Sequence, residues 1–348
     1  MRVRPLTISR LLGQCAVLLL ILFLIVLIAL KLGAVPVSLY GLGHDLFRVL
    51  IGRSNEISSD YSLIVFSLRL PRIFLAIFVG ASLSVAGCGF QALLRNPLAD
   101  PYVLGVSYGA AVGAMLAMIC EPYLPLPANI AALLTPVGGF FGAVVTIVAV
   151  YFLGRRQGQI ESTTLLLGGV ITGSFFSAII MFLMTVLPSG NTRGIAFWFM
   201  GDLSTPVQPS VGWVLRVGFL AAGLVIYATA SDLNLLLTGE KEAMHLGVDV
   251  PRVQLVVYLA ASLLAGLAVS VSGAIGYVGL LVPHAMRWIF GSDHRVLLPT
   301  AAIGGAIALV VADTLARTVV APTELPVGAV TAIAGAPLFL YLLRRRLT

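Results

Sequence analysis

The sequence predicts an all-α polytopic membrane protein with about ten transmembrane helices. Three observations support this fold class. Of the 348 residues, 59% are hydrophobic and only 10% are charged, whereas a soluble domain carries about 25% charged residues. Apolar runs close to the ~20 residues that cross a bilayer recur along the chain. Glycine is abundant, with 36 residues, and small residues let membrane helices pack closely.

The first helix is predicted at 11–32. Its apolar run follows three N-terminal arginines and ends at Lys31. A signal peptide has an apolar region of only about 7–15 residues, followed by a small-residue cleavage site. This run is longer, and no such site follows it. We therefore expect a retained helix whose N-terminus is cytoplasmic.

The later apolar runs predict nine further helices, and the glycine in them predicts a tight bundle. Helix 72–94 is an example, with Gly80, Gly87 and Gly89. The polar stretches between the runs are too short to form a core of their own, so one transmembrane domain is expected over 1–348. The predicted helices are 72–94, 103–120, 128–153, 163–187, 209–230, 253–272, 276–290, 296–319 and 327–343.

Charge predicts the orientation. Ten spans place both termini on one side, and the arginines at 344–346 agree with the N-terminal arginines that this side is cytoplasmic. Arg69 and Arg72 oppose the trend, because they fall at the outer start of helix 72–94. Their position suggests a partner outside the membrane.

Several function classes are disfavoured by composition. The net charge of +7 comes from basic residues at the ends of apolar runs, which is typical of loops at an anionic leaflet and not of a nucleic-acid surface. Cys15, Cys88 and Cys120 show no paired spacing, so neither a disulfide framework nor a zinc site is indicated. We expect no cofactor or metal in this chain.

Two tempting sites have simpler explanations. Residues 105–109 match the Gly-x-Ser-x-Gly pattern of serine hydrolases, with Ser107 as nucleophile and His284 as its only deep histidine. That motif needs a strand-turn-helix elbow, whereas Ser107 enters a helix, so we expect it to cap or pack the start of that helix. Pro283-His284 with Asp293 and His294 could suggest metal ligands, but two turns of helix and a loop separate them. A structural hydrogen bond is the better interpretation.

An energy source is missing from the chain itself. Its two lysines, Lys31 and Lys241, do not end a Walker A loop, so ATP would have to be bound by another subunit. An ion-coupled carrier would need ionisable groups near the midplane. Asp313, Arg216 and His284 are the candidates, and no midplane pair is expected among them.

Several ordered motifs resemble one transporter family over nearly the whole chain. This family is the type II ATP-binding-cassette (ABC) permeases, the membrane subunits of importers for iron chelates and cobalamin. The motifs are Arg69-Leu-Pro-Arg72, Arg95-Asn96-Pro97, Leu104-Gly105, Glu242-Ala243 with Leu246-Gly247, Pro283-His284, Asp313 with Arg317, and Glu324-Leu-Pro326.

The resemblance implies a set of partners and roles. It implies a homodimer, or a similar heterodimer, in the bacterial inner membrane. Two ATP-binding subunits would bind it on the cytoplasmic side, and one substrate-binding protein would bind it on the periplasmic side. It also implies a coupling helix within 232–251 that contacts the ATPase, and outer arginines that meet acidic residues of the binding protein. The coupling residues are Glu242, Ala243, Leu246 and Gly247; the docking residues are Arg69, Arg72 and Arg317; Arg95, Asn96, Pro97, Pro283, His284 and Asp313 belong to the family motifs.

The resulting hypothesis is a permease for a bulky metal chelate, with ATP used by the partner subunit. Ferric siderophores or haem are the leading cargo, cobalamin is second, and oxyanions such as molybdate are third. The alternative is an ion-coupled secondary transporter. Gly247 is expected to tolerate no bulky side chain, because the coupling helix would approach the ATPase closely there.

Overall fold

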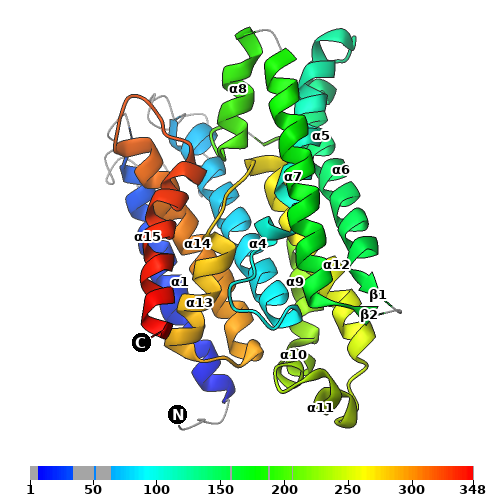
Figure 1. Ribbon diagram of the computed structural model, residues 1–348. Coiled ribbons are helices and arrows are strands. Elements are labelled where there is room, and N and C mark those ends of the chain that lie inside the picture. The colour runs from blue at the N-terminus through cyan, green and yellow to red at the C-terminus, as the bar shows by residue number, and fades with distance from the viewer. Residues whose placement is uncertain are drawn as a thin grey trace.

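The computed structural model describes residues 7–33, 51, 64–156, 159–186, 189–205 and 207–347. Apart from one two-residue hairpin, its regular elements are helices (Figure 1). In chain order they are α1 (Ile8–Lys31), the π-helical turn η2 (Ile64–Arg69), α4 (Leu70–Leu93), η3 (Pro101–Leu104), α5 (Val106–Cys120), η4 (Glu121–Tyr123), α6 (Ala128–Gly154), β1 (Arg155–Arg156), β2 (Gln159–Ile160), α7 (Ser162–Val186), α8 (Ser189–Phe199), α9 (Pro209–Ala228), α10 (Ala230–Leu236), α11 (Glu240–His245), α12 (Val250–Ser272), α13 (Val278–Phe290), α14 (His294–Thr318) and α15 (Val327–Leu347).

The all-α polytopic fold is confirmed. Each of the ten predicted segments is helical over most of its described residues. Seven helices in the described part of the chain are long and apolar enough to cross a membrane, and α13 and α15 are shorter apolar helices. Sequence reasoning missed α8, the β1–β2 hairpin and the π-helical turn. That turn extends helix 72–94 back to Ile64, so Arg69 and Arg72 lie inside a longer helix and not at its start.

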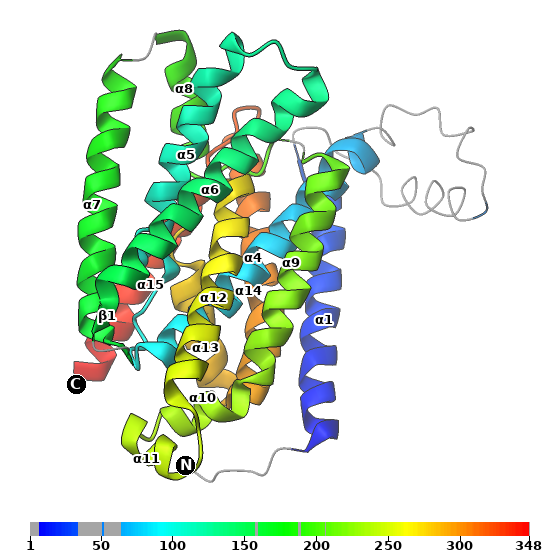
Figure 2. The same ribbon diagram turned by 90° about the vertical axis from the view of Figure 1, so that its right-hand side faces the viewer.

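Three helices form the centre of the bundle. The most apolar windows of α4, α12 and α14 are 83%, 78% and 67% buried, whereas those of α1 and α9 are 6% and 17% buried. Figure 2 shows α4, α12 and α14 between α1 and α9 on one side and α7 and α15 on the other. Buried residues in the central helices are mostly alanine, glycine, serine, valine and leucine. The outer faces of α1 and α9 are therefore left to lipid.

Glycine lets the central helices touch backbone to backbone. A Cβ atom on Gly80 of α4 would collide with the carbonyl oxygen of Gly305 on α14, and one on Gly305 would collide with that of Gly80. Gly87 of α4 meets the carbonyl of Gly279 on α13 in the same way. The predicted tight packing is thus built on glycine pairs from helices far apart in sequence.

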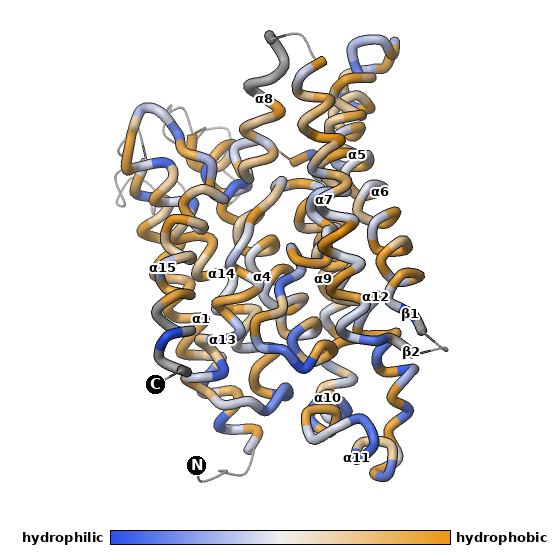
Figure 3. Tube along the Cα trace, in the orientation of Figure 1, coloured by the Kyte–Doolittle hydropathy of each residue, from blue (hydrophilic) through white to orange (hydrophobic). Residues whose placement is uncertain are grey.

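The two ends of the bundle differ. One end carries the short helices α10 and α11, between the end of α9 and the start of α12; the opposite end carries α8 (Figures 1 and 2). Hydrophilic residues concentrate at both ends, and the spans between them are largely hydrophobic (Figure 3). We call residues 230–249, which contain α10 and α11, the tip, and refer to the other end as the α8 end.

Candidate functional site

An ion cluster joins α4 and α14 near the α8 end. Arg72 Nε lies 2.8 Å from Asp313 Oδ1, and Arg317 Nε lies 3.0 Å from Asp313 Oδ2. Arg72 Nη1 also lies 2.7 Å from Glu324 Oε2. The Asp313 side chain is only 1% exposed, against 42% for Glu324. One buried carboxylate therefore holds two guanidinium groups, and the cluster reaches water through Glu324.

The same region fastens the end of α1. Arg69 Nη1 donates to the carbonyl of Leu30 at 2.6 Å, and Arg317 Nη2 donates to the carbonyl of Ala29 at 3.4 Å. The last carbonyls of a helix have no partner within the helix, and cations are favourable there. Arg69 and Arg317 thus satisfy the C-terminal turn of α1 and fix it to α4 and α14.

These contacts differ from the expected arrangement of the arginines. The position of Arg69 and Arg72 predicted that both face a partner outside the membrane. In the structure, Arg69 turns to α1 and Arg72 turns to Asp313, and Arg69 and Arg317 are each only 6% exposed. The docking role of Arg69, Arg72 and Arg317 stays a prediction. Of the two acidic partners, Asp313 is buried, and Glu324 is the group that a second protein could reach.

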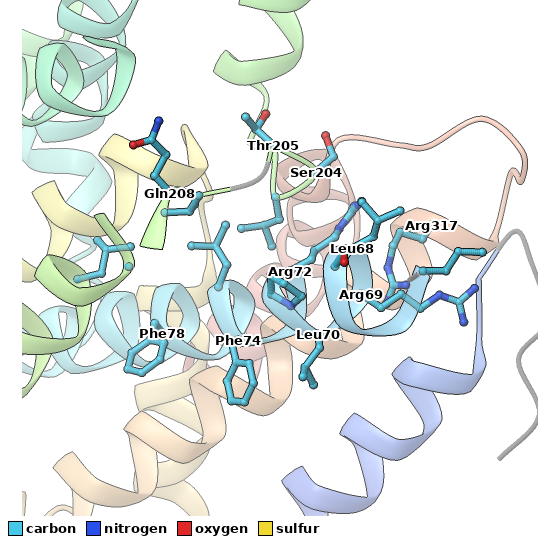
Figure 4. A pocket seen from close by; sticks show the side chains of 18 of the residues that line it. Leu68, Arg69, Leu70, Arg72, Phe74, Phe78, Ser204, Thr205, Gln208 and Arg317 are labelled. Carbon is cyan, nitrogen blue, oxygen red and sulfur yellow. The ribbon is translucent and has the colours of Figure 1, made fainter. Parts of the chain in front are cut away.

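A cavity of about 650 Å³ lies beside this cluster. It is lined by η2 and the first turns of α4, by residues 203–205 and 207–208, and by the first turns of α9. Figure 4 shows Arg69, Arg72 and Arg317 toward one end of it, Phe74 and Phe78 along α4, and Ser204, Thr205 and Gln208 across from them. Arg216 and Trp213 of α9 complete the wall. The cavity therefore combines cationic, polar and aromatic surfaces.

The tip exposes apolar side chains among its polar residues. Met244 and Leu246 are 45% and 63% exposed, while Ala243 is fully buried and packs into the core. Of the four predicted coupling residues, Ala243 therefore fixes the tip to the bundle, and Glu242, Leu246 and Gly247 face outward.

Gly247 has a different requirement from the one expected. No atom lies within 4 Å of a Cβ built at this position, so nothing in this chain crowds it. Its φ angle is +89°, however, a conformation that other residues rarely adopt. A bulky residue would therefore be strained by the backbone conformation of the turn after α11, whether or not a partner is bound.

The motif Arg95-Asn96-Pro97 forms the turn after α4 and contacts the tip. Arg95 adopts φ +47° and its Nη2 lies 3.0 Å from Glu240 Oε1, in the first turn of α11. Gln254 of α12 donates to the same Glu240 oxygen at 3.3 Å. Asn96 Oδ1 accepts a hydrogen bond from the backbone N–H of Leu98, which closes this turn. Glu240, which no sequence pattern singled out, thus links α4, α11 and α12.

A second connection runs from the tip to α14. Asp293 is the N-cap of α14, and its carboxylate accepts from the Arg295 N–H and guanidinium and, at 2.8 Å, from Asn234 Nδ2 of α10. Asn234 Oδ1 in turn accepts from the backbone N–H of His294 at 2.8 Å. The hydrogen bonds from Arg295 lower the pKa of Asp293 to about 2.

Replacing Asp293 is expected to weaken this connection in a pH-dependent way. Asp293→Ala should lower the free energy of unfolding by about 1 kcal/mol at pH 7, the usual loss for an N-cap. Asp293→Asn keeps a capping oxygen and loses only the charge. Because the folded pKa lies below the ordinary value of 3.8, the charge stabilises the fold above about pH 4 and stops doing so as the pH falls toward 2. Unfolding in detergent between pH 7 and pH 3 should show wild type and Asp293→Asn converging; a constant difference would contradict this origin.

The alternative chemical sites are not assembled. Ser107 is buried in the first turn of α5, which follows the left-handed Gly105 and the 3-10 turn η3, not a strand. Pro283 is buried inside α13, and His284 follows it there and has interactions within the chain. Among the described residues, no three histidine, cysteine or acidic side chains are grouped so that they could hold a metal ion.

Comparisons with known proteins agree with this architecture. The hemin transport system permease protein HmuU of Yersinia pestis is 40% identical over 323 residues, which cover 93% of this chain and 94% of the relative. The cobalamin import system permease protein BtuC of Halobacterium salinarum is 44% identical over 284 residues, which cover 81% and 74%. A solved structure of a transporter assigned to the metal-chelate ABC type, in an inward-facing conformation, has a TM-score of 0.78 at 29% identity and covers 96% of this chain and 99% of that chain.

The family comparison covers almost the full length. The pattern of the FecCD transport family matches residues 19–345, which include the ion cluster, the cavity, the tip and the loops that hold the tip. The resemblance drawn from the ordered motifs is thereby confirmed. The chain belongs to the FecCD transport family.

Proposed function

We propose that this chain is the transmembrane subunit of an ABC importer that moves a bulky metal chelate across the membrane by alternating access. The observation that carries the proposal is the family match over residues 19–345, together with a tip that exposes the apolar side chains of Met244 and Leu246. The chain does no covalent chemistry in this scheme. It changes conformation when the partner subunits bind and hydrolyse ATP.

Iron chelates are the proposed leading cargo. Relatives of this chain are named for hemin, for cobalamin and, in Bacillus subtilis, for Fe(3+)-citrate. All three are metal complexes, which supports a metal chelate over an oxyanion such as molybdate. A ferric siderophore or haem ranks first and cobalamin second.

The proposed assembly has two copies of this chain, two ATP-binding subunits and one substrate-binding protein. The tip and both termini face the cytoplasm. The α8 end lies at the outer surface of the inner membrane, where the binding protein docks. Met244 and Leu246 suit a contact with an ATPase, because exposed apolar side chains that project from a membrane bundle into water are unfavourable without a partner. Arg95, Gln254 and Asn234 would carry tip movement to α4, α12 and α14.

The tip contact can be tested with one substitution. Leu246→Glu should weaken binding of the ATP-binding subunit and lower ATP-driven uptake of a ferric siderophore by about ten-fold, because it places a charge in an apolar contact. The fold should survive, since Leu246 is 63% exposed. Uptake is measured in proteoliposomes that contain the ATP-binding subunit and the binding protein.

The matched control is Leu124→Glu, which changes a leucine that is 45% exposed at the α8 end. It should leave ATPase binding unchanged. Normal coupling in Leu246→Glu would remove the tip from this role. Uptake by the chain alone, driven by an ion gradient without ATP, would instead favour the secondary-transporter alternative.

A further inference from the structure

The cavity near the α8 end opens toward lipid. Arg216 lies seven residues after Pro209, the first residue of α9, and so about 10 Å along the span. Leu68, Phe74 and Trp213 line the cavity and are 56%, 46% and 64% exposed. Phe74 lies in α4 and Trp213 in α9, and apolar side chains exposed on the outside of membrane-spanning helices contact acyl chains. The opening at these side chains therefore faces one leaflet. The helix α9, which lines the cavity, lies on the side of the bundle away from α7 (Figure 2).

Arg216 lines this cavity and has no carboxylate partner among the described residues. Its guanidinium lies 5.1 Å from the ring centre of Trp213 and 6.0 Å from that of Phe78, and no described carboxylate lies within ion-pair distance of it. Asp313 and Glu324 are already paired with Arg72 and Arg317. An arginine held within a membrane span without a counter-ion marks a binding site. Its aromatic neighbours fix it without neutralising it.

The rest of the lining suits an amphipathic anion. Ser204, Thr205 and Gln208 offer hydrogen-bonding groups on the water side, and Phe74 and Phe78 continue as an apolar wall along α4 (Figure 4). A zwitterionic headgroup would bring an ammonium or choline group among several arginines. Glu324 is the carboxylate that lines the cavity, and Arg72 already binds it.

We propose that this cavity binds the headgroup of an anionic phospholipid of the phosphatidylglycerol type from the leaflet at the α8 end. The phosphate contacts Arg216, and the glycerol hydroxyls meet Ser204, Thr205 and Gln208. The acyl chains lie on Phe74, Phe78 and Trp213. A basic pocket between membrane helices recognises lipid by the same combination of charge and apolar surface. The site does not depend on the cargo or on the ATP-binding partner.

Native mass spectrometry of the purified full-length protein tests the site. Phosphatidylglycerol and phosphatidylcholine with the same acyl chains are titrated separately. Wild type should retain phosphatidylglycerol about five-fold better, as expected for one cationic contact near the membrane surface. Arg216→Gln should abolish the preference, and Arg216→Lys should restore part of it. Arg155→Gln is the matched control, because Arg155 also lies over an aromatic ring, that of Tyr151 at 5.8 Å, but at the tip end.

Three outcomes would overturn the proposal. Equal retention of the two lipids by wild type would remove the charge recognition. If Arg216→Gln kept the preference for phosphatidylglycerol and Arg155→Gln lost it, the lipid would bind elsewhere. Displacement of phosphatidylglycerol by millimolar inorganic phosphate would assign the site to a free anion. Quenching of Trp213 fluorescence by brominated phosphatidylglycerol, lost in Trp213→Phe but not in Trp288→Phe, would support the assigned cavity directly.

Discussion

Asp313→Ala is expected to destabilise the folded protein by about 3–5 kcal/mol, because it leaves two buried arginines without their shared counter-ion. The Asp313 carboxylate contacts Arg72 at 2.8 Å and Arg317 at 3.0 Å and is 1% exposed. The loss would extend to α1, because Arg317 also donates to the carbonyls of Ala29 and Leu32. Equilibrium unfolding in detergent micelles measures the change.

The design includes two controls. Glu324→Gln removes the exposed partner of Arg72 and should lower the free energy of unfolding by less than about 1 kcal/mol, as exposed ion pairs do. Asp313→Ala combined with Arg317→Met should recover part of the loss, because one uncompensated charge is removed. A loss below about 1 kcal/mol in Asp313→Ala would show that water reaches the cluster and that its burial is not what stabilises it.

The helices could be predicted from the sequence because hydropathy and span length are local properties. The segments 128–153 and 163–187 match α6 (Ala128–Gly154) and α7 (Ser162–Val186) within a residue at each end. The start of α4 was misplaced because Ile64–Arg69 forms a π-helical turn, which apolar character alone does not distinguish from a loop at a membrane surface. Because of this difference, Arg69 was expected at the surface, whereas in the structure it contacts α1.

The ion cluster could not be predicted, because its members come from distant parts of the chain. In sequence, 241 residues separate Arg72 from Asp313, and 145 separate Arg95 from Glu240. Periodicity shows which face of a helix is apolar, but it does not show which other helix will cover that face. The motifs located the important segments, and the packing of α4 on α14 decided which of their charges meet.

The packing of small residues could be predicted only in part. The sequence predicted close packing from the amount of glycine in helix 72–94, and the structure shows where each glycine is needed. Gly80 and Gly87 each face a carbonyl of another helix, whereas Gly13 and Gly223 have no atom within 4 Å of a built Cβ. Composition alone treats these four positions alike, because it contains no information on which side of a helix faces a neighbour.

Gly80→Leu is accordingly expected to prevent the folded bundle from forming, and Gly80→Ala to destabilise it by about 1–3 kcal/mol, the range for overpacking in a core. Even the alanine Cβ would overlap the carbonyl oxygen of Gly305, and backbone cannot move aside as a flexible side chain can. The matched control is Gly223→Ala in α9, where the built Cβ meets nothing and the better helix propensity of alanine should make the change neutral or slightly stabilising. The yield of monodisperse protein and the free energy of unfolding in detergent compare the variants. Equal stability of Gly80→Ala and Gly223→Ala would mean that α4 and α14 can separate without loss, and that their contact is not the centre of the fold.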